Sequence, residues 1–219
     1  MIKNLKLKIR NLQKGITLVE IVVIVFIIIL FTAILVSDFP RMLRQLALSR
    51  ATYNFAQNLR KAQDFGLSGV KLFDGSGTTE IAVKGYGIYI NISNNNKRYV
   101  IYADVANAAG NSDIKYSGDT TYPLCSSVNQ LSNGTLNTDC VIEVIDLSKE
   151  NPSIFIDSIT NVSGFSLTSI NFSPPGPKTN IDNLTVAVPA KTQIEIIFKN
   201  TDGIQRTVSI NTSGLISIE

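Results

Sequence analysis

The chain has 219 residues, two cysteines and no histidine or tryptophan, and its formal net charge is +3. This length suits one globular domain of ordinary size with one additional segment. The lack of histidine excludes the usual general base, the commonest metal ligand and any nucleophile activated by an imidazole. We therefore expect no enzyme, no catalytic residue, no metal or other cofactor and no small-molecule substrate, and the composition does not favour a nucleic-acid partner.

The first 15 residues carry the positive excess of the whole chain. The basic residues that precede the first acidic residue, Glu20, are Lys3, Lys6, Lys8, Arg10 and Lys14. Without residues 1–15 the count is 15 basic against 17 acidic residues, a formal charge of −2. Residues 1–15 therefore read as a leader, and the basic cluster before an apolar segment predicts that this leader lies in the cytoplasm.

An apolar segment follows the leader. Between Ile21 and Val36 the only polar residue is Thr32, and the apolar stretch counted from Ile16 has 21 residues. As a helix it would be about 30 Å long, enough to cross a bilayer once. We expect residues 16–37 to span a membrane, with everything after Ser37 on the side away from the cytoplasm. A plain signal anchor that keeps its leader is the alternative.

The junction between leader and apolar segment carries the most specific motif. Gly15 is followed by Ile-Thr-Leu-Val-Glu at residues 16–20 and then by the long apolar run. This order resembles the N-terminal signal of type IV prepilins and pseudopilins, although that family most often has Phe or Met at the position of Ile16. The resemblance implies cleavage after Gly15 by a membrane prepilin peptidase, N-methylation of Ile16, and neutralisation by Glu20 of the amine of a neighbouring subunit.

Glu20 is unusual on physical grounds as well. A charged side chain costs roughly 2.5–3.5 kcal/mol at the centre of a bilayer, so Glu20 is expected to have a partner. No Lys or Arg lies between Gly15 and Val36, and the candidate cation is the α-amino group that cleavage would create on Ile16. The alternative is that Glu20 lies among lipid headgroups.

A second helical segment is predicted over residues 38–69. Pro40 is expected to kink or interrupt the helix. After Arg41, apolar residues recur at steps of three or four, and Gly66 and Gly69 are expected to end the helix; the apolar positions are Leu48, Ala51, Phe55, Leu59, Ala62 and Phe65. The segment SRATYNFAQNLRKAQDFGLS resembles the helix of H-type minor pseudopilins of type II secretion systems. An apolar half followed by an amphipathic half is the lollipop stalk of pilins.

Residues 70–219 are expected to form an extracellular β-rich domain, so the predicted class is α+β. Residues 88–92 alternate in polarity, and an Asn94–Asn96 turn followed by residues 99–103 predicts a hairpin. The further predicted strands cover residues 141–147, 154–159, 165–172, 184–188, 194–199, 206–210 and 215–218, with a turn at residues 201–203. The phrases GYGIYINI, RYVIYAD and FSPPGPKT and the last residues of the chain also resemble H-type pseudopilin-like proteins.

Cys125 and Cys140 lie in a polar stretch of this domain. In an oxidising compartment one disulfide is expected, with a stabilisation of roughly 3 kcal/mol, and two free thiols are the alternative. Oxygen-bearing side chains that could bind calcium also gather nearby, but their spacing does not match an EF-hand and a solvated loop is favoured; they are Asp104, Asn107, Asn111, Asp113 and Asp119.

The sequence as a whole predicts a structural subunit of a type IV pilus or a type II secretion pseudopilus. Its expected partners are the prepilin peptidase, other pilins or pseudopilins and the inner membrane, and its destination is a cell-surface or periplasmic filament. Three other readings stay open. They are an anchored binding domain that keeps residues 1–15, an anchored hydrolase with two carboxylates in a pocket, and a competence pseudopilin that contacts DNA through a basic patch.

Overall fold

The computed structural model describes residues 16–73, 77–78, 80–106, 110, 114–117, 122–125, 139–160, 166–174, 178–182 and 193–219. These residues belong to two compact units, one ending at Met42 and one running from Leu43 to Glu219. The described parts of the chain form a long helix, α1, and antiparallel sheets. The predicted α+β class is therefore confirmed.

Helix α1 runs from Leu18 to Ser68 and contains Pro40. Of the kink or interruption expected at Pro40, the interruption is wrong, because the helical backbone continues through this residue. Proline lacks one amide hydrogen and so removes one i to i−4 hydrogen bond, here to the carbonyl of Val36. The other bonds of the ladder are enough to keep the helix continuous.

In the second unit, α1 buries one face. The predicted apolar positions Leu48, Ala51, Phe55, Leu59 and Ala62 are all at most 1% exposed, which confirms the spacing of three and four. Phe65 lies at the margin of this face and is half-buried. Thr52 is also buried, and its hydroxyl group donates to the Leu48 carbonyl at 2.7 Å, so burial leaves no polar atom of this side chain without a partner.

The two glycines near the end of α1 have different roles. Gly69 has φ +59°, a conformation that favours glycine, and its N–H donates to the Phe65 carbonyl at 3.1 Å, which ends the helix. Gly66 lies inside the helix, and a Cβ atom there would be 2.5 Å from the Phe172 carbonyl oxygen. The expectation that Gly66 stops the helix is thus wrong, because this glycine lets α1 approach a strand closely.

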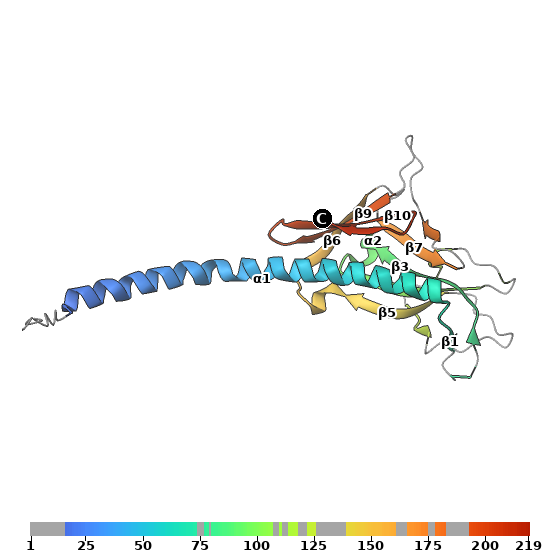
Figure 1. The fold of residues 1–219 in the computed structure, drawn as a ribbon, viewed down its shortest axis with the longest axis horizontal. Helices are drawn as coiled ribbons and strands as arrows, with labels where there is room; N and C mark the ends of the chain where they lie inside the picture. The colour runs from blue at the N-terminus through green and yellow to red at the C-terminus, as the bar shows by residue number, and fades with distance from the viewer. Residues whose placement is uncertain are drawn as a thin grey trace, which may run out of the picture. The chain divides into compact units, whose positions relative to one another are not determined.

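The strands of the described residues form three antiparallel sheets (Figure 1). The larger sheet has the order β5 (Cys140–Asp146), β4 (Arg98–Val105), β3 (Val83–Asn91), β7 (Leu167–Ser173) and β8 (Lys178–Ile181). The second sheet has the order β11 (Ile216–Ile218), β10 (Gln205–Asn211), β9 (Gln193–Asn200) and β6 (Ile154–Thr160). The third pairs β1 (Leu72–Phe73) with β2 (Glu80–Ile81). Two short helical turns, α2 (Ile92–Asn95) and a 3-10 turn (Leu147–Lys149), complete the described elements.

Most of the predicted strands are confirmed, with ends shifted by at most two residues, except that β3 begins at Val83, five residues before the predicted start. Strands β3 and β4 form the predicted hairpin, in which Tyr89 pairs with Val100. Its connection is a helical turn rather than a simple turn, because the Asn91 side chain accepts a hydrogen bond from the Asn94 N–H at 3.1 Å. The strand predicted over residues 184–188 lies outside the described residues, and β1, β2 and β8 were not predicted.

The core of the second unit lies between the buried face of α1 and the five-stranded and four-stranded sheets. Phe55 contacts Tyr99 on β4, with ring centroids 4.9 Å apart, and Phe198 on β9, with centroids 5.1 Å apart. One helix residue therefore joins the two sheets, and Figure 1 shows this cyan part of α1 beside them. At the start of this unit, Arg44 makes a bidentate ion pair with Asp202 in the β9–β10 turn, at 2.6 and 2.8 Å.

Candidate functional site

Of the residues that the sequence singled out, Glu20 lies in the first turn of α1. Gly15 lies outside the described residues, and Ile16 is exposed. The N–H of Glu20 donates to the Thr17 hydroxyl oxygen at 3.3 Å and to the Thr17 carbonyl at 3.1 Å. Thr17 therefore caps the helix, and Thr17 with Glu20 three residues later fits the capping-box pattern.

Because Thr17 caps the helix, Glu20 lies near the positive end of the helix dipole. The carboxylate belongs to the first turn, where the unpaired N–H groups and the helix dipole favour negative charge by about 0.3–1 kcal/mol. Within the described chain, Glu20 forms no ion pair. Its charge is thus partly stabilised by its own helix and available to a cation outside it.

The segment after Glu20 exposes its apolar side chains. Every Ile, Leu, Val and Phe from Ile16 to Val36 is between 48% and 77% exposed, so no described residue covers this segment. Thr32 donates its hydroxyl group to the Ile28 carbonyl at 2.6 Å, so its polar group needs no outside partner. The segment is long and apolar enough for a single membrane span.

Cys125 and Cys140 form a disulfide, with a Cα–Cα distance of 4.9 Å. Both residues are buried. The bridge attaches Cys125 to the first residue of β5, next to a parallel bridge between Leu124 and Val141. The predicted disulfide is confirmed, and its position shows that it holds a connecting segment against an edge strand of the larger sheet.

Two buried carboxylates lie at the same end of the larger sheet. Asp139 accepts hydrogen bonds from the Val105 N–H at 2.8 Å and the Ser117 N–H at 2.7 Å. Asp104 accepts from the Asn171 side chain at 3.0 Å. Both carboxylates therefore bind neighbouring polar groups of the fold, which gives the hydrolase reading no support.

Of the calcium ligands considered from the sequence, only one lies among the described residues. Asp104 is buried, whereas Asn107, Asn111, Asp113 and Asp119 lie outside the described residues. In the described ranges no group of three or more His, Cys, Asp or Glu side chains is placed to hold a metal ion.

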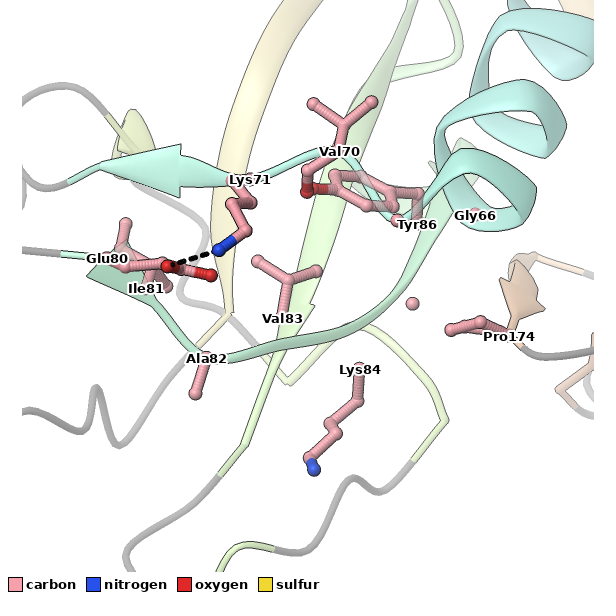
Figure 2. A pocket seen from close by; sticks show the side chains of 12 residues that line it. Gly66, Val70, Lys71, Glu80, Ile81, Ala82, Val83, Lys84, Tyr86 and Pro174 are labelled. Carbon is pink, nitrogen blue, oxygen red and sulfur yellow. Dashed lines mark hydrogen bonds and ion pairs between the residues drawn. The ribbon is translucent and has the colours of Figure 1, made fainter.

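A cavity of about 160 Å³ lies beside the end of α1. Figure 2 shows Tyr86 beside Val70 and Gly66, and Lys71 directed at Glu80, with which it forms an ion pair at 2.9 Å. The Tyr86 hydroxyl group donates to the Val70 carbonyl. Small-molecule sites are usually about 300–1,000 Å³, so this cavity suits a single side chain or a few water molecules, and neither buried carboxylate lines it.

Sequence reasoning singled out Gly15, Ile16 and Glu20, which stay predictions, and did not single out the cap at Thr17 or the buried Asp139. The Thr-x-x-Glu pattern at residues 17–20 could have revealed the cap. No sequence signal marks Asp139, because its hydrogen-bond donors lie 22 and 34 residues away in the chain.

No family model, no curated protein and no solved structure matches this chain.

Proposed function

We propose that this chain is a non-catalytic subunit, of the minor pilin or H-type pseudopilin kind, in a type IV pilus or a type II secretion pseudopilus. The observation that carries the proposal is the exposed apolar segment of α1, preceded by a basic leader and opened by a capped turn that contains Glu20. In this proposal a prepilin peptidase removes residues 1–15, and the β-rich domain lies outside the membrane on the lollipop stalk.

The energetics of assembly explain why a single carboxylate would matter. Side chains of residues 16–36 leave lipid tails for the core of a filament, and both surroundings are apolar, so transfer itself contributes little. Helix packing and polar pairs must then decide which subunits associate. Glu20 is the only charged residue among them, and pairing with an amine would offset part of the cost of its burial.

Processing would supply that amine. Hydrolysis of the bond between Gly15 and Ile16 leaves a protonated α-amino group on Ile16, and methylation keeps its charge. In its own chain this group lies just before the cap at Thr17, close to the unpaired N–H groups of the first turn. The positive end of the helix disfavours a second positive charge there, which favours pairing of the amine with Glu20 of a neighbouring subunit.

Replacing Glu20 by Ala tests the pairing. We expect the amount of the protein in sheared filaments to fall by about tenfold, which corresponds to about 1.4 kcal/mol, while the β-rich domain keeps its stability. Asp38→Ala is the matched control, because Asp38 is another exposed acidic residue of α1. Equal filament levels for Glu20→Ala and the unmodified chain would contradict the pairing.

The anchored binding domain and the competence pseudopilin predict different outcomes. A binding domain that never enters a filament would keep residues 1–15, and its level in sheared fractions would not respond to Glu20→Ala. A competence pseudopilin that contacts DNA would assemble in the same way but would also retain DNA, with an affinity that falls steeply as salt rises.

A further inference from the structure

The turn that joins β9 to β10 contains an aspartate followed by a glycine, Asp202 and Gly203. Residues 201–203 of this turn are exposed, and Gly203 has φ +81°, a conformation that favours glycine. Asp-Gly is the dipeptide at which aspartate isomerises most readily, because the glycine amide has no side chain beside it and can reach the aspartate carboxyl group. The turn therefore carries a reactive dipeptide that the proposed function does not use.

Isomerisation at this dipeptide takes two steps and needs no reactant other than water. The backbone nitrogen of Gly203 bonds to Cγ of Asp202, and the protonated carboxyl group gives up its hydroxyl, which leaves with the amide hydrogen as water. The product is a five-membered succinimide ring, which water then opens. Attack of water at Cγ restores aspartate, whereas attack at the backbone carbonyl gives isoaspartate, in which the chain runs through Cβ and the mass is unchanged.

The ion pair with Arg44 opposes the first step. Arg44 on α1 binds both carboxylate oxygens of Asp202, through Nε at 2.6 Å and through Nη2 at 2.8 Å. These charge-assisted hydrogen bonds stabilise the ionised carboxylate, whereas ring closure consumes the protonated form. They also direct the carboxylate toward α1. The pair must therefore break before the ring can close.

Asn200, the last residue of β9, restrains the attacking amide. The N–H of Gly203 donates to the Asn200 carbonyl at 3.0 Å. The N–H groups of Asp202 and Ile204 both donate to Oδ1 of Asn200, each at 3.0 Å. Ring closure requires the peptide group between Asp202 and Gly203 to rotate, and these hydrogen bonds oppose that rotation. Asn200 thus restrains the nucleophile of the reaction, and Arg44 restrains its carboxyl partner.

We propose that Asp202 is a latent modification site, at which isoaspartate forms when Arg44 does not bind the carboxylate, and that Arg44 protects this site in the folded domain. Isoaspartate adds one carbon atom to the backbone of the turn and places the carboxylate one bond nearer to the backbone. Arg44 would then lose its bidentate partner, and α1 its contact with the β9–β10 turn. The inference goes beyond the proposed function and does not rest on it, since every form of the chain contains this turn.

Ageing of the purified full chain in detergent at neutral pH tests the proposal. After proteolysis, electron-transfer fragmentation of the peptide that contains position 202 distinguishes isoaspartate from aspartate. A sample kept unfolded in urea gives the rate in the absence of the contacts of the fold. We expect isoaspartate to form at least about tenfold more slowly in the folded chain than in urea, since hydrogen bonds to a charged group must break first.

Variants of Arg44 test which contact protects the site. Arg44→Ala should raise the rate in the folded chain by about tenfold and leave the rate in urea unchanged. Arg44→Lys should give an intermediate rate, because lysine keeps the charge but cannot bind both oxygens as a planar fork. Arg50→Ala is the matched control, since Arg50 is exposed on the same helix and forms no ion pair with a described residue.

A general loss of stability must be separated from the loss of the ion pair. Gly87→Ala serves this purpose, because Gly87 lies in β3, in the five-stranded sheet, whereas the turn belongs to the four-stranded sheet. Overpacking at Gly87 should destabilise the domain. The rate of isoaspartate formation at Asp202 should nevertheless stay that of the unmodified chain.

Three results would overturn the proposal. The first is a rate in the folded chain equal to the rate in urea, and the second is a rate for Arg44→Ala no higher than that for Arg50→Ala. The third is a rate for Gly87→Ala as high as that for Arg44→Ala, which would show that the reaction follows unfolding. Because the assay uses purified protein and reports on one turn, a negative result leaves the filament proposal standing.

Discussion

Tyr86 joins the end of α1 to the larger sheet through its hydroxyl group, which donates to the Val70 carbonyl. Burial raises the pKa of Tyr86 from 10.0 to about 12. The ring also contacts Phe65 on α1, with centroids 5.6 Å apart. The neutral form of Tyr86 is therefore part of the folded state, and its ionisation opposes folding.

This gives a pH dependence with a definite sign. Between pH 10 and about pH 12 the unfolded chain loses the Tyr86 proton while the folded chain keeps it. The free energy of unfolding should then fall as pH rises through this window. Urea unfolding at several pH values should show a smaller fall for Tyr86→Phe than for the unmodified chain. Identical slopes for the two proteins would contradict this role of Tyr86.

Gly87, in the central strand β3, is a second residue on which packing depends. It pairs with Tyr102 on β4 and Asn171 on β7. A Cβ atom at this position would lie 2.6 Å from the Tyr102 ring and would also meet the Ile170 carbonyl oxygen. The ring of Tyr102, which is fully buried, can therefore lie over β3 only because residue 87 has no side chain.

Gly87→Ala should consequently destabilise the domain by about 1–3 kcal/mol, the usual cost of overpacking. The midpoint of urea unfolding measures the change, and Gln205→Ala, at an exposed position of β10, is the control. A midpoint equal to that of the control would show that Tyr102 moves aside without cost.

The disulfide acts at the scale of elements, because it fastens residues 122–125 to β5. Its two cysteines are 15 residues apart, so the chain-entropy model gives a stabilisation of about 3 kcal/mol. Replacing both cysteines by Ser should lower the free energy of unfolding by about this amount. Urea unfolding of the double variant measures it, beside the unmodified chain after complete reduction. A variant as stable as the oxidised protein would contradict the prediction.

Helices and strands with a regular apolar period could be predicted from the sequence, but the sheet to which each strand belongs could not. The spacing of Leu48, Phe55 and Leu59 predicted the buried face of α1, and alternation predicted β3 and β4. Strand β8 gave no such signal, since only Ile181 of its four residues is apolar. No local signal shows which strands belong to the five-stranded sheet and which to the four-stranded sheet. Strands β6 and β7, for example, follow one another in the chain but belong to different sheets.

The residues of the candidate site also differ in whether the sequence could predict them. Gly15, Ile16 and Glu20 were predicted because their motif is contiguous and lies at the border of an apolar run. The buried position of Asp139 depends on which end of a sheet the fold covers. Local spacing does not report that covering, so this feature needed the structure.

At the scale of the molecule, the N-terminal region combines three features. The basic leader, the capped turn at Thr17 and the exposed apolar segment form a continuous series along the chain. We interpret them as a leader to be removed, an assembly residue to be paired and a helix to be buried among other subunits. All three roles depend on cleavage after Gly15.

The most direct measurement is the N-terminal residue of the protein recovered from membranes. Intact-mass and terminal-peptide mass spectrometry, with and without the prepilin peptidase, determines it. The account predicts a chain that starts at Ile16, carries a methyl group on its amine, and appears only when the peptidase is present. A chain that starts at Met1 in both cases would contradict it and would indicate a permanently anchored surface domain.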